Sequence, residues 1–244
     1  MSDATAAILI IGNEVLSGKV DDTNSPFLIK ALRQRGIELV ELRVIADVVD
    51  SIIDATRALS AATHLFTTGG IGPTHDDMTI EAIAEAFERR VVHHPQLLER
   101  LHHRYGEELS PARLKLAEVP DGSLLHVSDE SPFMTIQFRN IFILPGVPSL
   151  MRSCFALVAD DLGGSPIYSR AVYLDVAESD AAAAVAEVQT RHPGVSVGSY
   201  PRFDSAPYRV KITVDSRNLD EVLLAVTDLK NSLKIEWMVD IDGG

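Results

Sequence analysis

The chain has 244 residues, 46% of them hydrophobic, so it can hold one large domain or a large and a small one. Its net charge of −13, with scattered basic residues, argues against nucleic acid or an anionic membrane as a partner. There is no apolar run of membrane-spanning length, no signal-peptide pattern, and a single cysteine, which excludes an intrachain disulfide and a cysteine-rich zinc site. We therefore expect a cytoplasmic protein.

The first part of the chain alternates strand and helix patterns. A continuous apolar run at 6–11 predicts a strand buried on both faces, and further strands are expected at 38–45 and 64–66. The first long helix is expected to have Ser25 as its N-cap and Pro26 at its first position, and the second to open at residue 50 or 51. This order predicts a parallel sheet with right-handed crossovers.

The middle of the chain has a helical pattern over 93–120, interrupted near Pro111. Short strands are then expected at 124–127, 134–138 and 141–144, and a helix near Pro148.

Turn-forming residues at 163–166 indicate a boundary, so we expect a first domain at 1–166 and a small α+β domain at 167–244. Within the second domain the expected order is strand, helix, two strands and helix, followed by a final strand at 235–241.

A glycine-rich loop lies between the strand ending at Phe66 and a helix beginning near Thr79. Three glycines in four residues allow positive φ and close approach of a ligand, and a helix start offers unpaired N–H groups. We expect this loop to bind phosphate, with a purely steric turn as the alternative. Thr79 is also well placed as the helix N-cap. The expected phosphate ligands here are Thr68, Gly69, Gly70, Gly72, Pro73, Thr74 and Thr79.

Two adjacent carboxylates, Asp76 and Asp77, stand inside this phosphate-binding pattern. They would repel a phosphate unless a metal ion or a proton lay between, and carboxylate oxygens suit Mg²⁺, Mn²⁺ or Co²⁺. One of them could instead be a general base, and composition alone would allow a solvated acidic turn.

Further polar groups follow the other expected parallel strands. Because ligands in such sheets bind at the carboxyl ends of the strands, these groups are predicted to share the rim of the glycine loop. Glu14 is a further metal ligand candidate and Asp47 a further acidic one, although each could simply be solvated or part of a turn. The remaining expected substrate ligands are Gly12, Asn13, Glu14, Pro145, Gly146, Pro148 and Ser149.

Other chemically reactive residues favour structural roles. The pairs His93-His94 and His102-His103 lack metal-ligand spacing and are expected to lie on a solvated helical face, whereas His75 is a better candidate because it lies inside the loop. Cys154 is expected to be a small core residue.

The ordered motifs resemble the MoaB/Mog molybdopterin-binding fold, in particular the amino-terminal region of CinA and, closer still, the molybdopterin-binding-like domain of eukaryotic FAD synthase. The resemblance implies an α/β fold of three layers, with a mostly parallel sheet and helices on both faces. The motifs that carry it are the loop 68–79, the segment 144–148, the opening 11–18, Asp22-Thr23-Asn24 and Gly198-Ser199-Tyr200-Pro201.

The resemblance also implies an activity and its residues. Asp47 and Asp77 align with the two functional carboxylates of the molybdenum-cofactor relatives, and the CinA and FAD synthase branches imply metal-dependent hydrolysis of ADP-ribose or FAD. The resemblance also allows K⁺ as a further ion. The ligand it implies is molybdopterin, a flavin or an adenine nucleotide, and the assembly it implies is a homodimer or a homotrimer. Ile71 replaces a threonine usual in the molybdenum enzymes, which argues against molybdopterin adenylation.

Two activities of longer relatives are not expected, and two alternative functions stay open. The sequence shows neither a nicotinamide-nucleotide amidase domain nor a FAD synthetase domain, so neither activity is expected. A non-catalytic molybdopterin- or nucleotide-binding protein is the first alternative function. An interaction domain that recruits a partner through the small C-terminal unit is the second.

Overall fold

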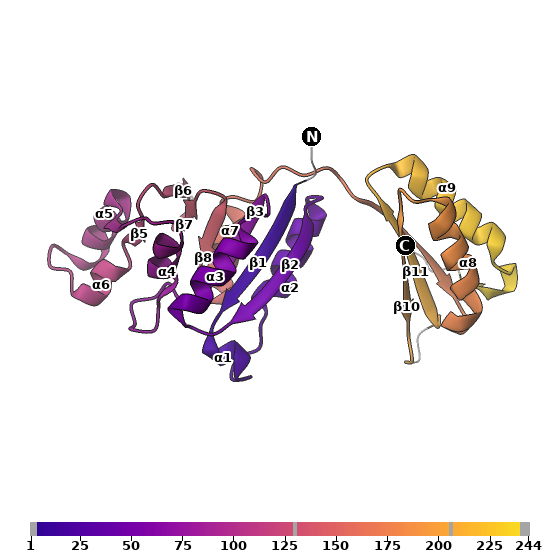
Figure 1. Cartoon of the computed structure of the whole chain (residues 1–244), viewed down its shortest axis with the longest axis horizontal. Coiled ribbons are helices and arrows are strands. Elements are labelled where there is room, and N and C mark those ends of the chain that lie inside the picture. Colours follow the sequence, from indigo (N-terminus) through magenta and orange to yellow (C-terminus); the bar gives the residue numbers. More distant parts are fainter. Residues whose placement is uncertain (1–3, 129–130, 205–206, 240–244) are drawn as a thin grey trace. The chain divides into compact units, whose positions relative to one another are not determined.

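The computed structural model describes residues 4–128, 131–204 and 207–239 (Figure 1). It forms two compact units, residues 1–165 and 166–244, and each is described by itself.

The first unit is built on a six-stranded sheet in which four neighbouring strands are parallel. The sheet has the order β2-β1-β3-β8-β7-β6, and β7 pairs antiparallel with both of its neighbours, β8 and β6. The continuous apolar run of the sequence becomes β1, which lies inside the sheet and is almost wholly buried. The strands are β1 (Thr5–Ile11), β2 (Glu38–Ile45), β3 (His64–Thr68), β6 (Leu124–Ser128), β7 (Ser131–Phe138) and β8 (Ile141–Leu144).

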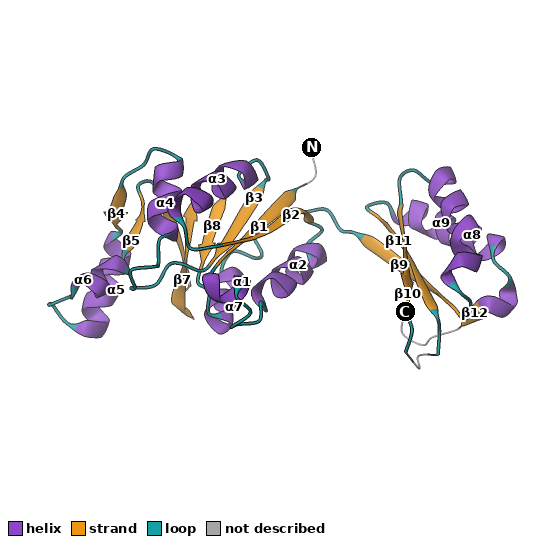
Figure 2. Cartoon of the chain, turned by 60° about the horizontal axis from the view of Figure 1, so that its bottom comes forward, coloured by secondary structure: helices purple, strands orange, loops and turns teal. Residues whose placement is uncertain are grey.

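Helices cover both faces of this sheet (Figure 2). Because successive side chains of a strand point to opposite faces, Ile8 packs toward α2 (Asn24–Gln34) and α7 (Pro148–Ala156), and Leu9 packs toward α3 (Val49–Leu59) and α4 (Thr79–Ala86). A single-turn helix, α1 (Asn13–Leu16), follows β1 directly. This three-layer arrangement confirms the predicted fold class.

The starts of the helices differ from the prediction by one or two residues. Helix α2 begins at Asn24 rather than after Ser25, because the Asp22 carboxylate accepts the amide hydrogens of Asn24 (2.9 Å) and Ser25 (3.0 Å) and starts the helix earlier. Helix α3 begins at Val49. Met78, not Thr79, is the N-cap residue of α4.

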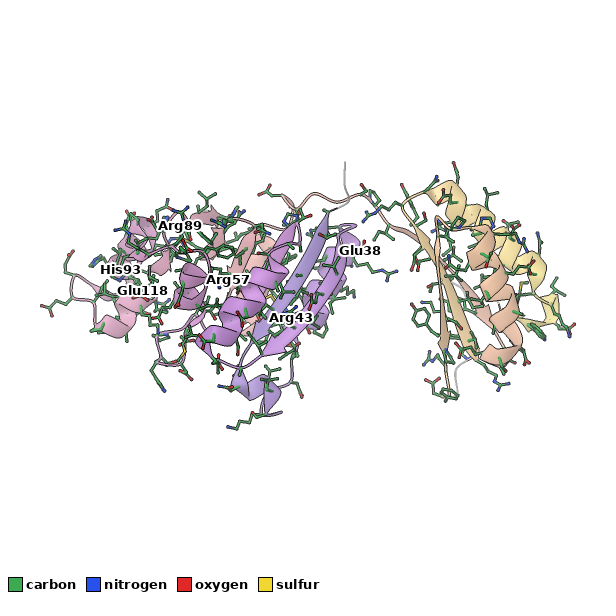
Figure 3. All side chains as sticks on the ribbon, in the orientation of Figure 1. Glu38, Arg43, Arg57, Arg89, His93 and Glu118 are labelled. Carbon is green, nitrogen blue, oxygen red and sulfur yellow. The ribbon has the colours of Figure 1, made fainter. Side chains whose placement is uncertain are left out.

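The helical pattern expected over 93–120, with a second piece from Pro111, is wrong at both ends, although the second piece does begin at Pro111. Strands β4 (Val91–His93) and β5 (Glu118–Pro120) pair antiparallel and enclose α5 (Pro95–Tyr105) and α6 (Pro111–Lys115). His93 and Glu118 are register partners, with His93 Nε2 3.9 Å from Glu118 Oε1 (Figure 3). The pairing joins segments far apart in sequence, so local helical periodicity could not reveal it.

The second unit is an antiparallel sheet, of order β10-β11-β9-β12, with two helices on one face (Figure 1). Its core joins sheet residues such as Val172 and Ile212 to Val188 and Leu229 of the helices. The elements are β9 (Tyr168–Leu174), α8 (Glu178–Arg191), β10 (Ser196–Pro201), β11 (Val210–Ser216), α9 (Leu219–Ser232), a 3₁₀ turn (Ile235–Trp237) and β12 (Met238–Val239).

The end of the second unit corrects one expectation. The strand predicted at 235–241 begins as the 3₁₀ turn and has only two described strand residues, while Ile241 lies outside the described residues. Among the helices of the described residues, none has the length and apolarity needed to cross a membrane.

Candidate functional site

Backbone hydrogen bonds join the loops that leave the parallel strands at their carboxyl edge. The amide of Gly12, after β1, donates to Ile45 O of β2 (3.1 Å), and the amide of Gly69, after β3, donates to Leu144 O of β8 (3.2 Å). An added Cβ on Gly146 would stand 3.3 Å from Gly69 Cα, so the loop after β8 packs directly on the glycine loop. Several predicted site residues therefore share one rim.

The glycine loop needs glycine at two positions. Gly69 has φ +100° and Gly70 has φ +64°, and a Cβ on Gly69 would overlap the carbonyl oxygen of Ile11. Fully buried Thr79 clamps this turn, since its Oγ1 donates to Gly69 O (2.8 Å) and its amide to Gly70 O (2.9 Å). Thr79 thus stabilises the loop by binding two of the loop's backbone carbonyl groups.

The amides of the loop are available to a ligand. Within the described part of the chain, those of Gly70, Ile71 and Gly72 donate to no other group. Three successive unpaired N–H groups suit an anion such as phosphate, and the N-terminus of α4 adds favourable partial charge.

The two aspartates of the loop converge on Thr74. The Thr74 amide donates to Asp77 Oδ2 (2.8 Å), and its hydroxyl lies 2.5 Å from Asp76 Oδ1 and 2.6 Å from Asp77 Oδ2. The Asp77 carboxylate also lies against Gly72, where an added Cβ would be 2.5 Å from Asp77 Oδ2. The side-chain hydrogen bond from Thr74, and after it the backbone amide of Asp76 itself, lowers the pKa of the exposed Asp76 carboxylate, which keeps this carboxylate ionised.

Asp47 and Glu14 lie on the neighbouring part of the rim. Asp47, half-buried after β2, accepts the Asn13 amide hydrogen at 2.7 Å, and the Glu14 carboxylate folds over Gly12. No group of three or more His, Cys, Asp or Glu side chains close enough to hold a metal occurs among the described residues. Glu14 as a metal ligand beside Asp76 and Asp77 therefore stays a prediction.

Asn24 is a site residue that the sequence argument did not single out. Its Nδ2 donates to Gly146 O (2.8 Å) and lies 3.5 Å from Thr68 Oγ1, which ties α2 to two strand-end loops. Its buried Oδ1 has no hydrogen-bond partner among the described residues. Asn24 also lines a cavity of about 50 Å³, together with Glu14. Its place in the Asp22-Thr23-Asn24 motif was the available signal.

A larger cavity of about 560 Å³ opens beside the glycine loop. Its lining includes Ile71 of the loop, Pro145 after β8, and cationic or aromatic side chains that the sequence argument missed. Those missed residues are Arg100, His103, Arg104, Tyr105 and Lys115. Lys115 reaches from α6 to the loop, where its Nζ donates to Thr74 O (3.0 Å) and lies 3.9 Å from Glu81 Oε1. Lys115 thus connects the cavity to the aspartate pair.

The other predicted residues take simpler positions. Gly146, Pro148 and Ser149 are exposed, with the last two in the first turn of α7. Pro73 is exposed at the outer part of the loop, and so is His75, whose Nδ1 lies 3.9 Å from Asp76 Oδ1.

The cysteine and the paired histidines keep mainly structural positions. Cys154 is buried, and desolvation raises the pKa of its thiol. His93 ends a strand, His94 accepts the Gln96 amide hydrogen at the start of α5, and His102 pairs with Gly106 O at its end. His103 lines the large cavity, so it is more than part of a solvated face.

The comparison with known protein families accounts for both units. Residues 7–163 match the family described as "Probable molybdopterin binding domain". The chain belongs to this family. Residues 166–242 match a second family, described as "FAD synthase, middle domain".

Relatives and a solved structure agree with this membership. A "Probable FAD synthase" of Caenorhabditis elegans is 30% identical over 260 residues, covering 94% of this chain and 50% of the relative. A protein of Archaeoglobus fulgidus is 30% identical over 227 residues, covering 93% of this chain and 96% of its own. The crystal structure of CinA, of unknown function, from Thermoplasma acidophilum has a TM-score of 0.61 and 28% identity over 66% of this chain and 99% of its own.

Some of these matches cover only part of the relative, so they do not transfer the relative's whole activity to this chain. The chain spans about half the length of the nematode FAD synthases that it matches. The similarity therefore establishes the domain family and the likeness of this chain to the CinA structure.

Proposed function

We propose that this protein is a divalent-metal-dependent hydrolase that cleaves the pyrophosphate bond of a nucleotide such as FAD or ADP-ribose. The observation that carries the proposal is the meeting, on one sheet edge, of three unpaired loop amides and the carboxylate pair joined by Thr74. The name FAD synthase of the nematode relatives, and the match to the middle domain of FAD synthase, support a flavin nucleotide as the substrate.

The backbone would bind the pyrophosphate. The amides of Gly70, Ile71 and Gly72 would donate to phosphoryl oxygens, and the start of α7 at Pro148 and Ser149 would face the same group from the loop after β8. The Thr79 clamp holds the carbonyls of Gly69 and Gly70, so the turn that carries the loop amides would need little reorganisation when substrate binds.

The aspartate pair fits a divalent ion. Mg²⁺ and related ions are commonly held by one or two carboxylates with substrate phosphates completing the shell, and Asp76 and Asp77 present oxygens on one side of Thr74. Such an ion would polarise a phosphoryl oxygen and offset the repulsion between phosphate and carboxylates. Glu14 would be a further ligand of the ion, and K⁺ could bind as a second cation at the same rim.

Asp47 would position and deprotonate the attacking water. Its Oδ2 accepts the Asn13 amide hydrogen, and this bond would orient the carboxylate toward the water. The water oxygen bonds to one phosphorus, the bridging P–O bond breaks, and the products of FAD would be FMN and AMP.

Replacing Asp77 by asparagine tests the proposal. We expect Asp77→Asn to lose about 100-fold or more of metal-dependent FAD or ADP-ribose hydrolysis, since it removes a charge where the phosphoryl group is stabilised. Asp54→Asn, an exposed aspartate of α3, is the matched control. The assay separates AMP and FMN chromatographically after incubation with Mg²⁺, Mn²⁺ or Co²⁺, with circular dichroism to verify folding. Unchanged hydrolysis in folded Asp77→Asn would refute the assignment.

The family match to a molybdopterin-binding domain favours a second candidate, a protein that holds molybdopterin or a nucleotide without turnover. A panel of FAD, ADP-ribose, NADH and CoA with each ion separates the two. Binding without release of any hydrolysis product across this panel favours the second candidate, and product release favours the first. A homodimer or homotrimer remains the proposed assembly, which sedimentation would test.

A further inference from the structure

The 560 Å³ cavity beside the glycine loop, called the ring pocket below, has an apolar wall that nothing in the described chain fills. Leu97 and Leu101 lie one turn apart on α5, and Leu116 follows α6. All three are only half-buried and belong to none of the apolar cores, and neither helix has a buried residue. The apolar face of α5 therefore faces a cavity rather than a protein core.

Cationic side chains stand around this apolar wall. Arg100, Arg104 and Lys115 line the ring pocket in a chain whose net charge is −13, together with His103 and one acidic residue, Glu118. A local excess of positive charge in an acidic protein suits a ligand with electron-rich oxygen atoms at one edge.

The ring pocket borders the proposed phosphate site. Ile71 lines it and lies between Gly70 and Gly72, and Pro145 lines it next to Gly146. Aliphatic residues from the sheet side, Ile136 and Ile143, close the opposite wall. A group attached to a phosphate on the glycine loop would enter this cavity.

We infer that the ring pocket receives the isoalloxazine ring of a flavin nucleotide, which rests on the proposed function. The dimethylbenzene half of the ring matches the wall formed by Leu97 and Leu101, and the carbonyl oxygens of its pyrimidine half match Arg100 and Arg104. The distal ribose of ADP-ribose has no apolar surface to place on the leucines, whereas the dimethylbenzene edge of a flavin has one. The site therefore selects FAD over ADP-ribose.

Equilibrium binding to the full chain tests the inference without hydrolysis. Quenching of flavin fluorescence gives the affinity for riboflavin and FMN, and calorimetry gives it for AMP and ribose 5-phosphate. We expect FMN to bind at least about tenfold more tightly than AMP or ribose 5-phosphate, and riboflavin to bind measurably although it has no phosphate. FMN binding no tighter than AMP, or no binding of riboflavin, would overturn the inference.

A matched pair of variants on α5 assigns the binding to this pocket. Leu101→Ala removes part of the apolar wall, so FMN and riboflavin binding should weaken by roughly fivefold to tenfold. Leu98→Ala, at a half-buried leucine of the same helix outside the pocket lining, should leave both affinities unchanged. Equal effects of the two variants, at matched thermal stability, would overturn the inference, and the wild-type ligand comparison decides it if Leu101→Ala does not fold.

The two proposals can fail separately. Flavin binding that depends on Leu101 without any release of AMP supports the ring pocket and overturns the hydrolase. Hydrolysis of FAD and ADP-ribose with equal kcat/KM, in a protein that does not bind riboflavin, supports the hydrolase and overturns the ring pocket.

Discussion

The Thr79 clamp gives a quantitative prediction about the glycine loop. Thr79→Val keeps the side-chain volume but removes the hydroxyl that donates to Gly69 O at 2.8 Å, in a residue with no exposed surface. A lost hydrogen bond costs about 1 kcal/mol, and a buried carbonyl left without that donor raises the cost to about 2 kcal/mol. For a unit of this size, we expect the melting temperature of the first unit to fall by about 4 to 8 °C.

Thr56 provides a control with the opposite expectation. It is equally buried, on α3, but its Oγ1 has no hydrogen-bond partner among the described residues. Thr56→Val removes an unsatisfied polar group and should leave stability unchanged or raise it by up to about 1 kcal/mol.

The assay is urea unfolding followed by circular dichroism, supported by scanning calorimetry, on wild type and both variants. Both substitutions lie in the first unit, so the destabilisation is expected in the unfolding of that unit. Equal destabilisation by Thr79→Val and Thr56→Val would refute the clamp, because the two changes differ only in the hydrogen bond.

Two further predictions concern the same loop. Gly69→Ala should destabilise the first unit by about 3 kcal/mol in urea unfolding, from left-handed strain and overlap with Ile11 O, whereas Gly163→Ala, with open space around it, should have little effect; equal midpoints would contradict this. The hydrogen bond from Thr74 lowers the pKa of Asp76. The stabilisation of the folded protein by this hydrogen bond is therefore complete above the ordinary carboxyl pKa, and it is lost as pH falls through the lowered pKa. The stability advantage of wild type over Thr74→Val should therefore shrink on acidification, and a gap that does not change with pH would contradict it.

Much of the fold followed from local pattern. The uninterrupted apolar run predicted the buried strand β1, and alternating strand and helix periods predicted a parallel sheet covered on both faces, as observed. Exact helix starts were less predictable, because a side chain such as Asp22 can accept the first amide hydrogens and start the helix two residues earlier than expected.

Part of the candidate site could likewise be predicted from the sequence, and part could not. Parallel strand order was enough to expect Asn13, Asp47 and the glycine loop on one rim, and the structure joins Asn13 to Asp47 there. Neither the role of Asn24 nor that of Lys115 could be read from spacing, since each contacts residues more than 40 positions away.

The sequence by itself determined the glycine and aspartate content of the loop and the alternation that buries β1, because these depend on neighbouring residues and on periods of two or 3.6. Tertiary structure alone decided that β4 and β5 pair, and that α5 turns its leucines toward a cavity beside that loop. The physical reason is range: side-chain periodicity shows that a face is apolar, but only the packed chain shows whether protein or empty space lies against it.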